Sequence, residues 1–360
     1  MPQHEKAIAV HLGSAGNLSE LCRLIESAGG EVIGEMLQKK DRVNPATLIG
    51  EGKVSELAEV VRLHRAQVVI FDNELKPVQQ RNLENILDVK VIDRTGLILD
   101  IFAQRARSRE GKIQVELAQM SYLLPRLAGH GIYLSRLGGG IGTRGPGEMK
   151  LEYDRRRIRK RISVLKSLIE QMASQRRIQR LRRQNAMIKV AALVGYTNAG
   201  KSSLLNALTS AGVRVEDKLF ATLDPTTRRL SSADCQVLLT DTVGFISSLP
   251  VQLIAAFKAT LEEVVEADFL LHIVDLSHPD WVSQMAAVNT VLGELGAGEK
   301  PVIVVFNKID LVHSGVIKRV TREYAESVAV SALKQINLLK LKEMLAKKCN
   351  TCSAFAGTAN

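Results

Sequence analysis

Short apolar runs alternate with amphipathic stretches through residues 1–103. The apolar runs predict strands over residues 6–10, 31–36, 68–71 and 89–92, and the amphipathic stretches predict helices over residues 18–28, 53–65 and 77–87. Alternation of this kind indicates a mostly parallel sheet covered by helices. Residues 1–103 are therefore expected to form an N-terminal α/β domain.

Residues 104–186 carry a different pattern, in which apolar side chains recur at steps of three and four. The repeat appears twice, first as Ile113, Leu117, Met120, Leu124 and Leu127, and again as Ile158, Ile162, Leu165, Ile169 and Met172. Such spacing is typical of two helices that pack along a common face. Between them, residues 138–147 are mostly glycine, which no regular element accommodates. The pattern predicts an antiparallel helical hairpin joined by a long glycine-rich loop.

Residues 187–348 return to alternating strand and helix signals and are expected to form a second α/β unit. Residues 349–360 are predicted to be a flexible tail. Cys349 and Cys352 have the spacing of half a zinc site, but no second pair with that spacing exists, so reduced thiols in an exposed tail are favoured.

The segment that follows the first strand of this second unit indicates its chemistry. It reads Gly195-Tyr196-Thr197-Asn198-Ala199-Gly200-Lys201-Ser202, between an apolar run and a helical stretch. In that context the pattern G-x-x-x-x-G-K-[ST] is a phosphate-binding loop, whose backbone N–H groups surround phosphate oxygens. Lys201 is expected to contact the β- and γ-phosphates and the transition-state charge, and Ser202 to bind Mg²⁺.

Four further segments follow in the order expected of a GTPase. They are Phe220-Ala221-Thr222-Leu223-Asp224, Asp241-Thr242-Val243-Gly244, Asn307-Lys308-Ile309-Asp310 and Ser331-Ala332-Leu333. Thr222 is a candidate switch contact that completes the Mg²⁺ shell, and Asp241 would hold Mg²⁺ through water while the Gly244 N–H senses the γ-phosphate. The expected fold of residues 187–348 is thus a P-loop NTPase G domain, with a mostly parallel sheet flanked by helices.

The nucleotide is expected to be GTP. The Asp310 carboxylate can accept both N1–H and the exocyclic amine of guanine, whereas adenine offers an acceptor at N1 and has no 2-amino group. An ATPase or small-molecule kinase is the alternative for this half of the chain. Phe245 stands where many small GTPases have a water-positioning Gln, so we find no catalytic base and expect slow hydrolysis that a partner stimulates.

The positive charge of the chain is concentrated in one segment. The formal net charge is +11, and residues 155–183 hold twelve Lys and Arg residues against one acid, so the remainder is formally neutral. A segment whose charge is almost entirely positive indicates a polyanionic partner. The alternatives are that the basic segment is only a solvated helix face and that the glycine-rich stretch is only a flexible linker. The candidate nucleic-acid contacts are Arg136 and Arg144 in the glycine-rich loop, and Arg155, Arg156 and Arg157.

The wider composition favours a cytoplasmic protein. No apolar run approaches the roughly 18–20 residues that a membrane helix needs, and no long apolar signal region begins the chain. Four cysteines form no disulfide framework in a chain of 360 residues. We expect a monomer without a membrane span.

Taken together, these motifs resemble the HflX family of translational GTPases, in the Obg-like group. The likeness covers nearly the whole chain and rests on the phosphate loop, on Phe220–Thr227, on Asp241–Phe245, and on the glycine-rich loop followed by Asp154-Arg155-Arg156-Arg157. It implies a cytoplasmic protein that binds the large ribosomal subunit in its GTP form and splits or rescues stalled ribosomes under stress. The hairpin and N-terminal domain would then contact ribosomal RNA near the peptidyl-transferase region.

The resemblance also implies a second cation. Asn198 matches an Asn that helps bind K⁺ beside the phosphates in related GTPases, so K⁺ joins Mg²⁺ as an expected cofactor. Two departures from the family pattern are visible. Met149, Lys150 and Tyr153 replace more polar residues, and the chain stops soon after the G domain, where many members carry a further domain.

Two other functions fit the same sequence. One is a GTP-dependent regulatory switch that acts on a protein partner, with the basic hairpin merely solvated. The other is an RNA remodeller unconnected with ribosomes.

Overall fold

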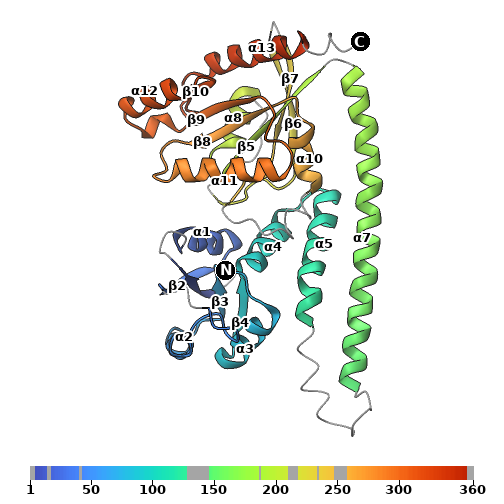
Figure 1. Ribbon diagram of the computed structural model, residues 1–360, viewed down its shortest axis with the longest axis vertical. Coiled ribbons are helices and arrows are strands. Elements are labelled where there is room, and N and C mark those ends of the chain that lie inside the picture. Colours follow the sequence, from blue (N-terminus) through green and yellow to red (C-terminus); the bar gives the residue numbers. More distant parts are fainter. Residues whose placement is uncertain are drawn as a thin grey trace. The chain divides into compact units, whose positions relative to one another are not determined.

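The computed structural model describes residues 5–13, 18–39, 43–127, 146–185, 188–209, 218–232, 235–246 and 258–354. The chain divides into two compact units, Met1–Gln171 and Met172–Asn360 (Figure 1). Each unit is built on a sheet whose strands are mostly parallel and whose flanks are helical. No helix in the described part of the chain is both long enough and apolar enough to cross a membrane.

The first unit contains a four-stranded parallel sheet with the order β2-β1-β3-β4. Its elements are β1 (Lys6–Leu12), α1 (Leu18–Ala28), β2 (Glu31–Gln38), α2 (Glu51–His64), β3 (Val68–Phe71), α3 (Pro77–Leu87), β4 (Lys90–Asp93) and α4 (Arg94–Arg105). These strands and the first three helices lie where the sequence predicts them. Helix α4 was not predicted; it begins where the Asp93 carboxylate caps it, accepting a hydrogen bond from the Gly96 N–H at 2.9 Å.

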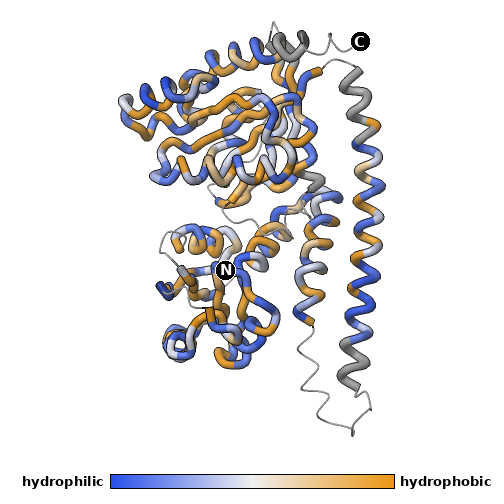
Figure 2. The backbone as a smooth tube through the Cα atoms, viewed as in Figure 1, coloured by the Kyte–Doolittle hydropathy of each residue, from blue (hydrophilic) through white to orange (hydrophobic). Residues whose placement is uncertain are grey.

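The core of this unit lies between the sheet and the helices. Strand β3 is buried at all four positions, and it faces Leu57 of α2 and Leu83 of α3, both fully buried. Figure 2 shows hydrophobic residues concentrated in the strands, while α7 is largely hydrophilic. The alternation of buried strands with one-sided helices is the pattern on which the sequence prediction rested.

Two long helices complete the first unit, and the second of them continues past its last residue, Gln171. They are α5 (Arg109–Arg126) and α7, a 40-residue helix (Pro146–Asn185). The Arg161 guanidinium donates two hydrogen bonds to the Glu116 carboxylate, at 2.6 and 2.7 Å, so α7 runs beside α5 here as the predicted hairpin requires. The glycine-rich loop with Arg136 and Arg144 lies outside the described residues.

The predicted packing face of α5 is not its most deeply buried side. The five residues of the apolar repeat on α5, from Ile113 to Leu127 in steps of three and four, are only half-buried. In the corresponding repeat on α7, only Leu165 is fully buried. The fully buried side of α5 carries Gln114, Val115, Ala118 and Tyr122 instead. Helix α5 packs on α3 and α4, and the apolar repeat does not identify the side that makes these contacts most deeply.

The second unit contains a six-stranded sheet with the order β10-β9-β8-β5-β7-β6, in which only β6 is antiparallel. Its elements are β5 (Lys189–Gly195), α8 (Lys201–Thr209), β6 (Thr226–Ser232), β7 (Cys235–Asp241), α10 (Lys258–Glu266), β8 (Phe269–Asp275), α11 (Trp281–Glu294), β9 (Val302–Asn307), the 3₁₀ helix η3 (Ile309–Leu311), α12 (Ser314–Glu323), β10 (Ser327–Ala329) and α13 (Leu338–Ala354). The carboxyl ends of β5, β7, β9 and β10 meet at one edge of the sheet, where open α/β sheets bind ligands.

The predicted flexible tail is wrong for its first residues. Helix α13 continues to Ala354, and Cys349 is 3 % exposed in the same core cluster as Leu341 and Leu345. The spacing of these three side chains is four residues, so they share one helical face and anchor the end of the chain. Among the described residues no group of three or more His, Cys, Asp or Glu side chains could hold a metal ion, so the half zinc site gains no partner.

Candidate functional site

The glycine-rich loop joins the end of β5 to the start of α8, and two of its glycines are sterically required. Gly195 has φ +156° and Gly200 has φ +90°, conformations that other residues rarely adopt. A Cβ atom on Gly195 would lie 2.2 Å from the Ile273 carbonyl oxygen, and one on Gly200 would lie 2.3 Å from Asn307 Nδ2. The loop therefore packs closely against the Ile273 backbone and the Asn307 side chain, which leave no room for a side chain at these two positions.

Lys201 supplies the buried positive charge of this cradle. Its Nζ donates hydrogen bonds to the carbonyl oxygens of Gly195, at 3.1 Å, and Tyr196, at 2.8 Å. Burial lowers the pKa of Lys201 to about 8, and the nearby Asp241 carboxylate opposes that shift. Because Lys201 also opens helix α8, its ammonium and the positive end of the helix favour an anion at the same place.

Three side-chain oxygens meet beside this lysine. Ser202 Oγ donates to Asp241 Oδ2 at 2.6 Å and shares a hydrogen bond of 2.8 Å with Thr222 Oγ1. Asp241 is completely buried, which raises its pKa, and its Oδ1 has no hydrogen-bond partner among the described residues.

These oxygens fit Mg²⁺, which prefers a few hard oxygen ligands together with water and substrate phosphates. A cation here would give the buried Asp241 oxygen Oδ1 the partner that it lacks among the described residues. Ser202 and Thr222 could hold Mg²⁺ directly and Asp241 through water. When bound, Mg²⁺ supplies positive charge to the β- and γ-phosphate oxygens.

Asn307 links the phosphate loop to the segments predicted to bind the base. Its Nδ2 donates to the Ala199 carbonyl oxygen at 3.0 Å, and its Oδ1 accepts from the Ala332 N–H at 3.1 Å. The neighbouring Lys308 has a left-handed backbone, φ 62°, and its Nζ lies 2.6 Å from Asp275 Oδ2. Asp275 was not singled out from the sequence, although it ends the apolar strand β8 as Asp241 ends β7.

Phe245 lies beneath the loop instead of facing the phosphates. Its carbonyl oxygen accepts from the Thr197 N–H at 2.7 Å, and its N–H donates to the Gly195 carbonyl oxygen at 3.0 Å. The side chain is 1 % exposed and offers no polar atom, so it cannot orient an attacking water. Gly244 is equally constrained, because a Cβ there would lie 2.8 Å from Thr197 Cα.

One hollow brings together most of the predicted phosphate and switch residues. It is lined by Thr197, Asn198, Gly200, Lys201, Ser202, Ser203, Lys218, Phe220, Ala221, Thr222, Thr242 and Gly244. Ser203 and Lys218 were not predicted. Leu223 and Val243 are buried beside it, and Asp224 is half-buried.

The residues predicted to bind the base follow β9 and β10 at the same end of the sheet. Hydrogen bonds of Asn307 connect them to the phosphate loop at Ala199 and to Ala332. Asp310 is exposed in η3, Ile309 is buried, and Leu333 is 82 % exposed. Ser331 is buried and its Oγ accepts from the Lys334 N–H at 3.0 Å. Arg155, Arg156 and Arg157 lie on α7, far along the chain from this site.

Comparison with known proteins agrees with this geometry. The chain matches three family descriptions: GTP-binding GTPase N-terminal over residues 15–103, GTP-binding GTPase Middle Region over residues 105–183, and 50S ribosome-binding GTPase over residues 190–308. A solved structure described as SsGBP with GDP aligns over 97 % of this chain and 99 % of its own, with 25 % identity and a TM-score of 0.53.

Two relatives named GTPase HflX extend the comparison to whole sequences. The protein of Caldanaerobacter subterraneus subsp. tengcongensis is 52 % identical over 349 residues, which are 96 % of this chain and 80 % of the relative. The protein of Escherichia coli K12 is 49 % identical over 314 residues, 86 % of this chain and 74 % of the relative. These matches show that the chain belongs to the HflX family of GTPases, which bind and hydrolyse GTP.

Proposed function

We propose that this GTPase binds the large ribosomal subunit through its RNA when GTP is bound, and that it splits or rescues stalled ribosomes under stress. In this proposal it acts in the cytoplasm as a monomer. The loop 195–202 and the segments 220–224, 241–244, 307–310 and 331–333 bind GTP with Mg²⁺. The observation that carries the ribosomal part is the nearly single-sign charge of α7.

Several arginines of α7 form no ion pair with the residues that the structure describes. Arg155, Arg156 and Arg157 form no ion pair with any described residue, and the last two are exposed. Arg161 and Arg176, by contrast, are paired with Glu116 and Glu262. The unpaired guanidinium groups are available for phosphates, and counterion release on contact with RNA would favour binding. The family description of residues 190–308, 50S ribosome-binding GTPase, supports the ribosome as source of that RNA.

An ion pair within the second unit gives the nucleotide site a route to α7. Arg176 NH2 lies 2.8 Å from Glu262 Oε2, and both side chains are largely buried. Glu262 belongs to α10, which follows the D-x-x-G segment in sequence. In this proposal, a rearrangement of that segment around the γ-phosphate is transmitted to α7 through the Arg176–Glu262 pair.

Salt dependence separates RNA binding from the alternative of a solvated hairpin. If α7 contacts phosphates, the affinity of the chain for isolated large subunits should fall steeply between about 50 and 200 mM salt. Sedimentation of the GTP-analogue form across this range is the measurement. Salt-independent binding would favour a regulatory switch acting on a protein, and equal salt-sensitive binding to unrelated structured RNA would favour a general RNA remodeller.

The isolated chain should hydrolyse GTP slowly. Because buried Phe245 cannot orient water, we expect a single-turnover rate on the order of 10⁻² s⁻¹ or below without a partner. Addition of large subunits should raise the rate by ordering the switch segments. A fast rate for the isolated chain in single-turnover assays would contradict this account of Phe245.

Hydrolysis should also depend on the monovalent cation. Asn198 lies in the wall of the phosphate hollow with a left-handed backbone, φ 63°, which suits a side chain that bonds locally beside the loop. We propose that it helps bind K⁺, whose charge partly replaces an arginine finger. Rates in K⁺ should exceed those in Na⁺ and fall to the Na⁺ level in Asn198→Ala. Equal rates in both salts would remove K⁺ from the proposal.

A further inference from the structure

The first unit contains a pocket that is unrelated to the nucleotide site. It lies along the outer edge of β4, between α3, α4 and α5, and has a volume of about 380 Å³. Its apolar lining comes chiefly from Val91, Leu99, Met120, Leu123 and Leu127. This volume is within the range of pockets that hold small organic molecules.

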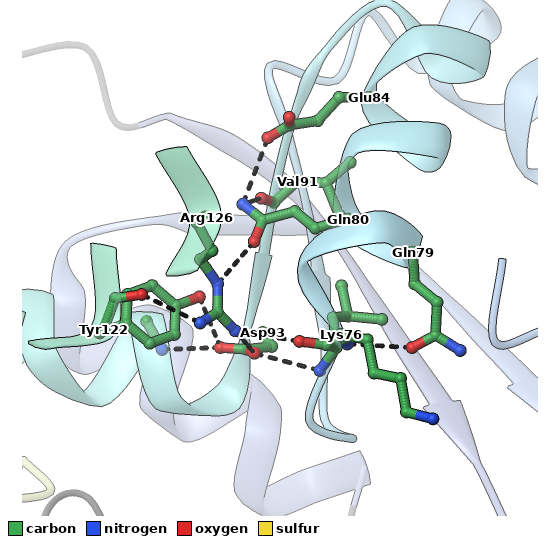
Figure 3. A network of polar contacts seen from close by, with 10 residues as sticks. Lys76, Gln79, Gln80, Glu84, Val91, Asp93, Tyr122 and Arg126 are labelled. Atoms are coloured by element: carbon green, nitrogen blue, oxygen red, sulfur yellow. Dashed lines mark hydrogen bonds and ion pairs between the residues drawn. The ribbon is translucent and has the colours of Figure 1, made fainter. Parts of the chain in front are cut away.

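The wall of the pocket is preformed by a buried polar network (Figure 3). Asp93 is completely buried; its Oδ1 accepts from the Tyr122 hydroxyl at 2.8 Å, and its Oδ2 accepts from Arg126 at 2.9 Å and from the Leu75 N–H at 3.1 Å. The Arg126 guanidinium also lies 3.5 Å from the centre of the Tyr122 ring. A carboxylate so fully engaged fixes α5 against β4, and the pocket does not depend on a ligand for its shape.

Two classes of ligand are disfavoured by the same network. Gln80 Nε2 donates to the Val91 carbonyl oxygen at 2.8 Å, so this outward group of the edge strand is already bonded and an added strand would have to displace it. Arg126 donates to Gln80, Leu75, Tyr122 and Asp93, so its guanidinium has little capacity left for an anion.

Asp100 is the acidic group of the lining that has no partner among the described residues, whereas Glu84 accepts a hydrogen bond from Gln80. Its carboxylate is half-buried, and it forms no hydrogen bond and no ion pair with any described residue. Burial raises the pKa of Asp100, and only the more distant Lys90 ammonium opposes that effect. A half-buried carboxylate in an apolar wall is costly unless a donor satisfies it, and a cationic ligand would do so. The other charged residues of the lining are Glu84 and three cations, of which Arg126 is paired with Asp93 and Lys90 is exposed.

We propose that this pocket binds a small organic cation, with a protonated amine paired to the Asp100 carboxylate and an apolar body against Met120 and Leu123. The volume of the pocket, about 380 Å³, limits the ligand to a small molecule. The proposal is independent of the ribosomal function, since the pocket lining contains none of the α7 arginines on which that function rests.

The test uses three probes that share one body and differ in charge: 4-phenylbutylamine, 4-phenylbutanol and 4-phenylbutyrate. Each is titrated into the full chain saturated with Mg²⁺ and GDP, and binding is followed by ligand-observed NMR and calorimetry. We expect the amine to bind about tenfold or more tightly than the other two, as a charge-assisted hydrogen bond in a half-buried site predicts.

Asp100→Asn keeps the shape of the side chain and removes its charge, and it should abolish the preference for the amine. Asp88→Asn is the matched control, because Asp88 is exposed at the end of α3, outside the pocket lining, and Asn tolerates its left-handed backbone, φ 54°. Leu123→Trp, which adds bulk to the lining, should weaken all binding. Equal affinities for the three probes, unchanged amine binding in Asp100→Asn, or no amine binding to the unaltered chain would each overturn the proposal.

Discussion

Replacing Gly200 with alanine is expected to weaken GTP binding about 100-fold or more. A Cβ at this position would lie 2.3 Å from Asn307 Nδ2, and the backbone would keep φ +90°, which costs an alanine strain. Asn307 would have to move, and with it the hydrogen bonds to Ala199 and Ala332. A single methyl group would thus disturb the phosphate loop and both of the segments that we propose to bind the base.

The measurement is the dissociation constant of a fluorescent GTP analogue, with thermal unfolding of each variant as a check on folding. Gly293→Ala is the matched control in the same unit, because no atom lies within 4 Å of a Cβ built there. That control should bind GTP normally and be slightly more stable, since alanine favours a helix. Near-normal affinity in a folded Gly200→Ala variant would show that this glycine is not needed for the nucleotide site.

Reversing the charge of Arg155, Arg156 and Arg157 to Glu is expected to weaken ribosome association about 1,000-fold or more. The three guanidinium groups form no ion pair with described residues, so their replacement breaks no such pair in the fold. The remaining association should also show a smaller salt slope, by about one for each RNA phosphate that the variant no longer neutralises. GTP binding should be unchanged, since the nucleotide hollow is lined by other residues.

A control with the same change in net charge distinguishes a local contact from general repulsion. Lys318, Arg319 and Arg322 are exposed on α12, and their triple replacement by Glu should lower ribosome association far less. Sedimentation of both variants with large subunits, after circular dichroism has verified folding, gives the comparison. Survival of association in the α7 variant, or equal losses in both, would refute the assignment of α7 as the RNA contact.

Much of the fold follows from local patterns in the sequence. The strands β1, β3 and β4 are short apolar runs, and the phosphate loop has a spacing that allows little else, so their positions could be predicted within a few residues. Lys201 and Asp241 could be expected to lie together because they follow parallel strands that end at one edge, whereas Thr222 was assigned from the order of the GTPase motifs. The close contact between Gly200 and Asn307 explains why the loop needs a glycine at this position. The sequence alone does not predict that contact, because the two residues are far apart along the chain.

Other features depend on contacts between distant parts of the chain. The apolar repeat of α5 identified one helix face but could not show that Val115 and Ala118, on another face, pack more deeply. Cys349 is buried in the core of the second unit, but no sequence motif marks that burial. A flexible tail was therefore predicted from residue 349 onward. The Asp93–Arg126 pair spans 33 residues and has no sequence signature, so the pocket behind it was not foreseen.

The central claim is that GTP controls association with the large ribosomal subunit, and co-sedimentation in three nucleotide states tests it most directly. Isolated large subunits are mixed with the chain and a non-hydrolysable GTP analogue, GDP or no nucleotide, at one fixed salt concentration. The account predicts that the chain pellets with subunits in the GTP-analogue state and remains largely in the supernatant in the other two. Equal pelleting in all three states, or none in any, would contradict it.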